Sequence, residues 1–241
     1  MKITDKIKNK QADMRASDPI TIAFLGDSVT QGCYECYLKA DGSIETLYDG
    51  KSAYSTRLRE LLNLLYPNVQ INIINSGISG DSAVSAVTRV DRDIVKYRPD
   101  LVVVSFGLND CCGGLGNLEH YADALRKIFK QVKDCGAEVI FLTQNYMNTE
   151  VSCHLKEACF VDLANRLAQI QNGGILNKYF EKAMVVCMEM DIEVCDLYRC
   201  WEKMESAGVD ITALLANKLN HPIREYHYYI AIKLLEKILG V

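Results

Sequence analysis

The sequence predicts an α/β fold in which one parallel β-sheet is covered by helices on both faces. Five short apolar runs alternate with segments of helical periodicity along the chain. These runs lack polar alternation, which is typical of strands buried between two layers of helices. Because crossover connections between parallel strands are right-handed, few strand orders are possible, and we expect the flavodoxin-like order 2-1-3-4-5.

The predicted strands are short and rich in aliphatic and β-branched residues. They are Ile20–Leu25, Val69–Asn75, Leu101–Phe106, Glu138–Thr143 and Ile192–Asp196. No repeat, low-complexity stretch or linker divides the chain, so we expect residues 1–241 to form a single domain.

The segments between and after the strands predict six helices. They are Tyr54–Leu65, Ser82–Tyr97, Asn117–Cys135, Leu155–Gln171, Leu176–Met190 and Ile223–Leu239. The second should end before Pro99, because proline disfavours a helical residue in front of it. The third should begin at an asparagine cap, Asn117, and end at Gly136.

One connection is too long for a simple loop. After the first strand, residues 33–53 contain two extended runs separated by Asp41-Gly42, which is a strong hairpin signal. We therefore expect an inserted hairpin beside the carboxyl end of the first strand. A second insertion, Trp201–Leu219, precedes His221.

Composition and charge are those of an ordinary globular protein. The chain has 241 residues, 49% hydrophobic and 24% charged, with a net charge of −4. This charge gives no case for nucleic acid as a partner, and no apolar run approaches the roughly 20 residues that span a bilayer. The first eighteen residues lack the apolar segment of a secretory signal, so we expect a cytoplasmic protein.

The 10 cysteines are scattered, and several fall in apolar helix or strand patterns. We interpret most of them as small buried hydrophobic residues, including Cys135, Cys159, Cys187 and Cys195. The sequence does not assign a role to two local pairs, Cys33 with Cys36 and Cys111 with Cys112. Cys33-x-x-Cys36 has the spacing of a redox or zinc half-site, but no second such pair exists, and we expect no metal.

Polar residues that could carry chemistry follow the first three strands. The segments are Gly26-Asp27-Ser28, Asn75-Ser76-Gly77-Ile78-Ser79-Gly80-Asp81 and Gly107-Leu108-Asn109-Asp110. Because parallel strands share one carboxyl edge, these segments should meet there. Ser28 could be a nucleophile and His221 its base, while the backbone N–H groups of Ser28 and Gly80 and the Asn109 amide could stabilise an oxyanion. Taken alone, each segment is more often a cap or a turn.

Together with Asn220-His221-Pro222, these segments resemble the SGNH/GDSL hydrolase superfamily, whose motifs occur in this order. The resemblance implies the SGNH hydrolase fold with Ser28 as nucleophile, His221 as general base, and Gly80 and Asn109 in the oxyanion hole. It implies that Asp27 mainly anchors the turn of the nucleophile. No cofactor or metal is needed for such a reaction.

The sequence departs from this superfamily immediately before His221. The usual pattern is Asp-x-x-His, but Lys218 stands at the aspartate position and cannot accept the imidazole Nδ1–H. Lys218 should therefore point to solvent. The group that orients His221 could be Asn217, Asp210, Asp196 or a backbone carbonyl, and a Ser–His dyad is equally compatible with the sequence.

These features predict a serine esterase that forms an acyl-enzyme and hydrolyses a short-chain ester of a small molecule or carbohydrate, most simply an acetyl group on a carbohydrate. The insertions are polar and tyrosine-rich rather than rich in leucine or phenylalanine, which favours a short acyl group. A lysophospholipase or an acyl thioesterase is the alternative. An alternative of another class is a non-catalytic scaffold that only binds a ligand. The oligomeric state is not predicted.

Overall fold

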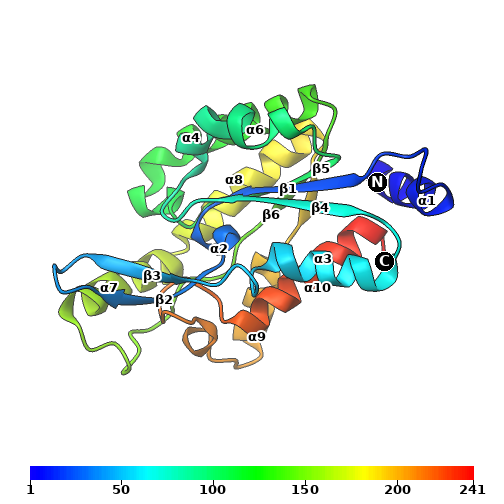
Figure 1. Ribbon diagram of the computed structural model, residues 1–241. Helices are drawn as coiled ribbons and strands as arrows, with labels where there is room; N and C mark the ends of the chain where they lie inside the picture. The colour runs from blue at the N-terminus through cyan, green and yellow to red at the C-terminus, as the bar shows by residue number, and fades with distance from the viewer.

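The computed structural model describes residues 1–241 and contains a five-stranded parallel sheet (Figure 1). Its strands are β1 (Ile20–Gly26), β4 (Ile71–Gly77), β5 (Leu101–Ser105), β6 (Glu138–Leu142) and β7 (Glu193–Cys195). The strands lie in the order β4-β1-β5-β6-β7, and all neighbours are parallel. Numbered along the chain, this is the predicted order 2-1-3-4-5, which is therefore confirmed.

Helices cover both faces of this sheet. They are α1 (Lys2–Ala12), α2 (Ser28–Gln31), α3 (Tyr54–Leu65), α4 (Ala83–Ala86), α5 (Val90–Asp93), α6 (Leu118–Asp134), α7 (Ala158–Asn172), α8 (Ile175–Met190), α9 (Tyr198–Ser206) and α10 (Arg224–Leu239). Helices α4, α6 and α8 form one layer, and α3 and α10 pack together in the other (Figure 1). No helix combines the length and the apolar character that crossing a membrane requires.

The helices and the sheet enclose one continuous core of 60 buried hydrophobic residues. Helix α6 shows how it is built, because its apolar stripe, including Leu125, Phe129 and Val132, is buried while its charged side chains are exposed. Phe129 meets Phe141 of β6 edge to face, with ring centroids 6.0 Å apart. Burial of each such side chain stabilises the fold by roughly 1.5–3 kcal/mol.

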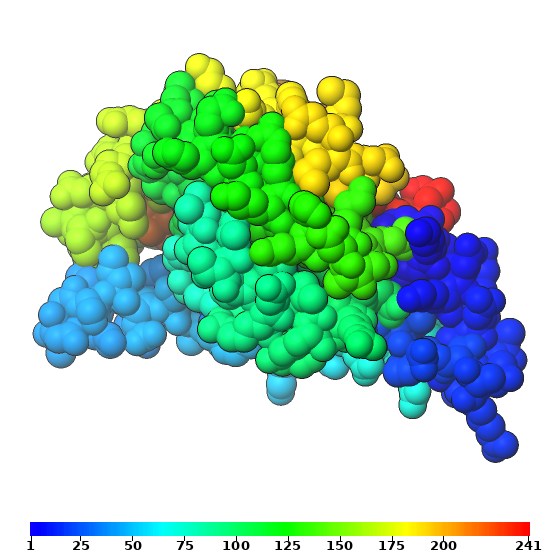
Figure 2. All heavy atoms as spheres, turned by 90° about the horizontal axis from the view of Figure 1, so that it is seen from above, coloured from blue at the N-terminus to red at the C-terminus, as the bar shows by residue number.

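The predicted hairpin is present and projects from the end of the molecule opposite α1 (Figures 1 and 2). Strands β2 (Cys33–Leu38) and β3 (Ile44–Tyr48) pair antiparallel. Their turn contains Gly42, whose φ of 80° is readily adopted only by glycine. The hairpin begins one residue after α2, so it starts directly beside the carboxyl edge of the sheet.

The expectation of one continuous helix over residues 82–97 is wrong. The segment is broken into α4, a 3₁₀ turn at Val87–Arg89, α5 and a second 3₁₀ turn at Val95–Tyr97. Its β-branched residues weaken a continuous helix. The segment also carries Arg89, whose guanidinium donates to the carbonyl oxygens of Gly26 and Ser76. These tertiary hydrogen bonds favour the broken path over a continuous helix.

Three helices were not predicted, α1, the short α2 and α9. Only Ile3, Ile7 and Lys10 of α1 are buried, so its apolar stripe is very narrow, and the Glu138 carboxylate accepts the N–H groups of Lys2 and Ile3 at its first turn. Helix α9 overlaps the start of the predicted insertion, Trp201–Leu219, and it buries Tyr198 and Trp201.

The expectation that most cysteines are buried is wrong, because only four of the ten are buried. All are free thiols, and Cys187 and Cys195 are buried in the core. Cys159 is exposed, which corrects the prediction for that residue, because it lies on the solvent face at the start of α7. Cys135, the residue that follows α6, is only partly buried.

The close approach of β4 to α2 leads to a prediction of stability. A Cβ added at Gly77 would fall on the Gln31 backbone, with the Gln31 Cα atom 2.7 Å away. We expect Gly77→Ala to lower the free energy of unfolding by about 1–3 kcal/mol, measured by urea denaturation. Gly116→Ala is the matched control, since a Cβ there meets nothing within 4 Å. Equal stability of the two variants would contradict the prediction.

Candidate active site

Ser28 lies on the turn where β1 ends and α2 begins. Asp27 is the N-cap of α2: its Oδ1 atom accepts the Val29 N–H at 3.0 Å, and its Oδ2 atom accepts the Gln144 side-chain amide at 2.8 Å. A side chain at Gly26 would strike Thr30 and the Ser105 carbonyl oxygen, so a glycine is required before the turn. Asp27 therefore fixes the turn that presents Ser28.

His221 and Ser28 lie within hydrogen-bond distance although they are far apart in the sequence. The His221 Nε2 atom is 2.9 Å from Ser28 Oγ, and its Nδ1 atom is 2.8 Å from the backbone carbonyl oxygen of Tyr34. A carbonyl can only accept, so Nδ1 carries the hydrogen and Nε2 accepts from the Ser28 hydroxyl. Burial lowers the pKa of His221 from its usual 6.5, which keeps the imidazole neutral and able to take a proton near pH 7.

The three side chains expected as alternatives for orienting His221 are engaged elsewhere. Asn217 Oδ1 accepts the backbone N–H of His221 itself, at 3.0 Å, as well as those of the two preceding residues. Asp210 accepts the Ala213 N–H, and Asp196 accepts the Thr143 hydroxyl. None of them forms a hydrogen bond to the imidazole. The expectation that Asn217, Asp210 or Asp196 orients His221 is therefore wrong.

A backbone carbonyl takes that position instead, which was the remaining alternative. It belongs to Tyr34 on β2 of the inserted hairpin rather than to the loop before His221. Lys218 has a left-handed φ of 59°, and its Nζ atom donates to the Ala213 carbonyl oxygen. The Lys218 side chain thus bonds to the backbone of its own loop and makes no hydrogen bond to His221.

The remaining candidate groups lie on the loops after β4 and β5. Gly80 has a φ of 77°, and neither its N–H nor that of Ser28 donates to an acceptor within the protein. The Asn109 amide donates to the Asp81 carbonyl oxygen at 2.8 Å and lies 3.5 Å from Asp27 Oδ2. The longer contact is too weak to hold the second amide hydrogen, which remains available to a ligand.

The sequence analysis missed Arg89, which joins these loops from within. Its guanidinium is buried, donates to Asp81 Oδ2 at 2.7 Å, and donates to the carbonyl oxygens of Ser76 at 2.7 Å and Gly26 at 3.0 Å. A second carboxylate, Asp93, lies 3.2 Å away. No distinctive signal marked it in the sequence, because residues 88–96 also contain other charged side chains, Asp91, Arg92, Asp93 and Lys96.

Two carboxyl groups at this edge of the sheet are almost completely buried. Burial raises the pKa of Asp27 to about 6 and that of Asp110 to about 7. Asp110 Oδ1 accepts the Ala83 N–H at 3.0 Å, whereas Asp110 Oδ2 has no hydrogen-bond partner. The Asp110 carboxyl is therefore partly protonated at neutral pH.

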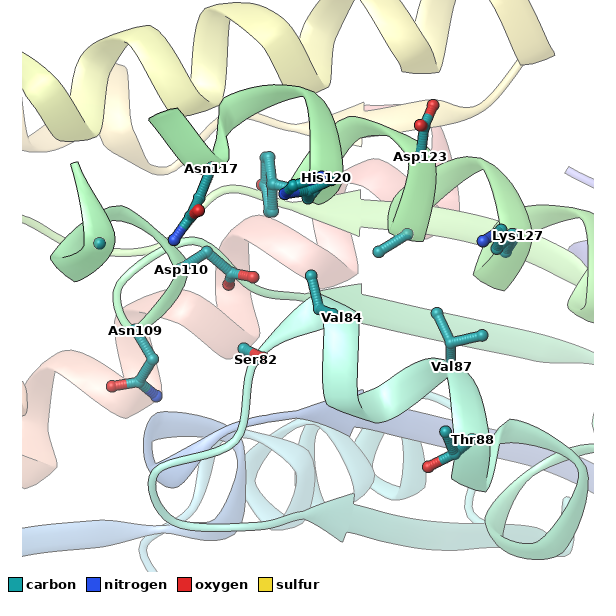
Figure 3. Close-up of a pocket in the computed structure, with 13 residues that line it drawn as sticks. Ser82, Val84, Val87, Thr88, Asn109, Asp110, Asn117, His120, Asp123 and Lys127 are labelled. Atoms are coloured by element: carbon teal, nitrogen blue, oxygen red, sulfur yellow. The ribbon is translucent and has the colours of Figure 1, made fainter. Parts of the chain in front are cut away.

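A groove of about 540 Å³ begins at Asn109 and runs between α4 and α6 (Figure 3). Ser82, Asn109 and Asp110 lie at its inner end, and Lys127 lies at the far end. Its lining mixes polar side chains with four hydrophobic residues, Val84, Val87, Tyr121 and Ala124. The lining residues are Ser82, Val84, Val87, Thr88, Asn109, Asp110, Gly113, Asn117, His120, Tyr121, Asp123, Ala124 and Lys127.

The cysteine pairs near the site hold no metal-binding arrangement. No cluster of three or more metal-ligating side chains occurs in the structure. Cys36 Sγ contacts Thr46 and Asn217, while Cys111 and Cys112 both donate to the Leu108 carbonyl oxygen.

Comparison with known proteins gives one family. The model of the GDSL-like Lipase/Acylhydrolase family matches residues 24–227. An acetylxylan esterase of Geobacillus stearothermophilus is 28% identical over 135 residues, which cover 52% of this chain and 60% of that protein. The GDSL esterase/lipase WDL1 of Oryza sativa subsp. japonica is 30% identical over 146 residues, covering 56% of this chain and 54% of that protein. The chain thus spans less than two thirds of the length of these relatives.

Solved structures share the fold. A two-domain esterase active on acetylated mannans has a TM-score of 0.67 at 18% identity, covering 99% of this chain and 52% of that one. A catalytic mutant of Axe2, an acetylxylan esterase from Geobacillus stearothermophilus, has a TM-score of 0.67 at 21% identity, covering 91% and 94%.

The buried Asp110 carboxyl predicts a pH dependence of stability. Its pKa is raised from near 3.9 in the unfolded chain, so the stability that it contributes is present below about pH 4 and is lost as the pH rises through about 7. Asp110→Asn cannot titrate. From pH 5 to pH 8, its free energy of unfolding should therefore rise relative to that of the wild type by about 1–3 kcal/mol.

Asp123→Asn, on the exposed side of the same groove, is the control for this measurement. A constant difference between Asp110→Asn and the wild type across this pH range would contradict the prediction.

Proposed function

Because the chain belongs to the GDSL-like lipase/acylhydrolase family, we propose that it is a serine esterase that removes acetyl groups from carbohydrates. The observation that carries this proposal is the 2.9 Å hydrogen bond between Ser28 Oγ and the Nε2 atom of His221. A hydroxyl paired with a neutral, correctly oriented imidazole is an activated nucleophile.

In the proposed reaction, Ser28 Oγ attacks the ester carbonyl carbon while His221 Nε2 takes the hydroxyl proton. The resulting tetrahedral intermediate collapses when His221 returns that proton to the leaving sugar hydroxyl. Water then gives a proton to His221 and attacks the acetylated Ser28. Collapse of this second intermediate releases acetate while His221 returns the proton to Ser28 Oγ, which restores the free enzyme.

The negative charge on the tetrahedral intermediate needs donors that are fixed before the reaction begins. We assign this role to the N–H groups of Ser28 and Gly80, which have no protein acceptor, and to the Asn109 amide. Asp27 holds the turn and takes no proton in this scheme. These assignments require neither a metal nor a cofactor.

The groove between α4 and α6 supports a carbohydrate as the alcohol part of the substrate. It begins at Asn109 and offers hydroxyl, amide, imidazole, carboxylate and ammonium groups over a floor that includes Val84 and Ala124. Such a lining suits sugar rings, which have many hydroxyls and small apolar faces. The similar proteins described as esterases of acetylxylan and acetylated mannans act on substrates of this class.

The alternatives are a lysophospholipase or acyl thioesterase and a non-catalytic ligand-binding scaffold. A long acyl chain would need a continuous apolar lining, and only four of the thirteen residues that line the groove are hydrophobic. The aligned Ser28 and His221 favour turnover over binding alone. The cytoplasmic location stays a prediction.

Ser28→Ala tests the proposed nucleophile. We expect the loss of about 10³–10⁶-fold in kcat on p-nitrophenyl acetate and on acetylated xylan, with an unchanged melting temperature. Ser43→Ala, at the exposed hairpin turn, is the matched control and should keep full activity. A Ser28→Ala variant with more than about a tenth of wild-type kcat would exclude Ser28 as the nucleophile. A series of p-nitrophenyl esters from acetate to palmitate measures the preferred acyl length in the same assay.

The groove leads to a separate prediction about the sugar. The double variant His120→Ala/Lys127→Ala removes two polar side chains from its outer part. We expect KM for acetylated xylo-oligosaccharides to rise about 5- to 150-fold, because two lost hydrogen bonds of about 0.5–1.5 kcal/mol each sum to about 1–3 kcal/mol. Kinetics on p-nitrophenyl acetate should not change. Lys130→Ala, on the exposed face of α6, is the control, and an equal change in both variants would argue against the groove as a sugar site.

A further inference from the structure

The base of the proposed esterase is held by a neutral group. His221 Nδ1 donates to the Tyr34 carbonyl oxygen, and no carboxylate touches the ring. His221 is 5% exposed, so the imidazolium that forms during catalysis gains little from water. In a Ser–His–Asp arrangement an acid stabilises this cation. The structure must supply that stabilisation in another way.

Three charged side chains, Arg224, Glu35 and Asp49, form one ion-pair cluster beside Tyr34. Arg224, the first residue of α10, donates to both Glu35 carboxylate oxygens at 2.6 and 3.0 Å and to Asp49 Oδ2 at 3.1 Å. Glu35 is on β2, and Asp49 directly follows β3. Arg224 thus joins the base of the hairpin to the segment that carries His221, which lies three residues earlier in the chain.

The Arg224 guanidinium also contacts Tyr34, whose carbonyl oxygen accepts the hydrogen bond from His221. Its central carbon lies 4.2 Å from the centroid of the Tyr34 ring, and the His227 ring lies 4.8 Å from it on centroids. The Tyr34 side chain is fully buried. A ring held by these two contacts leaves its peptide group little freedom to turn away from His221.

The charges of this cluster favour a cation at His221. Glu35 and Asp49 carry two negative charges against one positive charge on Arg224, so one negative charge remains. The other charged or titratable groups near this cluster are His227 of α10 and Arg57 of α3, whose positive charge is paired with Glu60. Burial lowers the pKa of His227 to about 3, so His227 stays neutral and adds no competing cation.

The peptide group between Tyr34 and Glu35 links the imidazole of His221 to the carboxylate of Glu35. Its carbonyl oxygen accepts from His221, and its N–H belongs to Glu35. Arg224 most strongly, and also the backbone N–H of Glu35 itself, lower the pKa of the Glu35 carboxyl. A carboxylate beside the N–H end of a peptide increases the negative partial charge on its carbonyl oxygen.

We propose that Glu35, held by Arg224 and assisted by Asp49, replaces the missing triad acid by acting on His221 through the Tyr34 peptide. Glu35 and Arg224 are positioning residues in this scheme, since they touch His221 only through the peptide. The proposal rests on the esterase function proposed above.

Glu35→Gln tests this role, because it removes the charge and keeps the shape. We expect kcat on p-nitrophenyl acetate to fall about 5- to 20-fold with an unchanged KM. The acidic limb of the kcat–pH profile should move down by about half a pH unit or more, because loss of a nearby negative charge lowers the pKa of an imidazolium. Glu35→Asp, which keeps the carboxylate, should recover part of the lost kcat.

Glu45→Gln is the matched control on the same hairpin. Glu45 is paired with Lys39 and is 46% exposed, against 45% for Glu35. We expect Glu45→Gln to leave kcat and the pH profile unchanged. A Glu35→Gln variant with an unchanged pH profile, or equal losses in both variants, would overturn the proposal, since either result indicates only a structural role of the hairpin.

A measurement independent of turnover separates this proposal from the proposed function. The imidazole of His221 can be titrated by NMR in the wild type and in Glu35→Gln, with its signal assigned by comparison with His221→Gln. A lower midpoint in Glu35→Gln supports the coupling even if no ester is hydrolysed. An unchanged midpoint refutes it even if the enzyme is active.

Discussion

The carboxyl edge of the sheet depends on one buried guanidinium. Arg89 donates to the carbonyl oxygens of Gly26 at the end of β1 and of Ser76 in β4, and it pairs with Asp81 in the loop that follows β4. A buried cation that lost these acceptors would cost several kcal/mol, so the strand ends and the loop are held as one unit. Gly80 is in this loop, and the Asp81 carbonyl receives the Asn109 amide. The proposed oxyanion donors therefore take their positions from a side chain that is itself outside the reaction.

A second arginine, Arg224, stabilises the part of the site that contains His221. Both arginines pair with two carboxylates, Arg89 with Asp81 and Asp93, and Arg224 with Glu35 and Asp49. They differ in exposure, which is 7% for the Arg89 side chain and 31% for that of Arg224. Water and salt screen the outer pair more strongly. The oxyanion side should therefore be insensitive to ionic strength, whereas the contribution of the Arg224 cluster should weaken in salt.

The sequence predicted the features that follow from residue type and strand order. Apolar runs marked the strands, and the polar residues after three of them had to share one edge, which brought Ser28 and Asn109 to the same end of the sheet as Gly80. A backbone carbonyl was among the predicted alternatives for orienting His221, but the residue that supplies it could not be predicted, because every residue has a carbonyl and only the hairpin geometry selects that of Tyr34. The broken segment at residues 82–97 was missed for a similar reason. Its helical periodicity is real, but tertiary contacts of Arg89 override it.

The position of the acceptor changes which parts of the chain must stay aligned. An aspartate three residues before His221 would move with the base, on the same loop. Tyr34 instead follows Ser28 by six residues, so the nucleophile and the group that orients the base lie on one short segment. The His221 loop then needs only to dock between them, and Arg224 at the start of α10 secures that docking through Glu35 and Asp49. Lys218 is free to bond within its own loop because the catalytic geometry no longer depends on that position. The inserted hairpin therefore belongs to the framework of the proposed active site, because it supplies the carbonyl that orients His221.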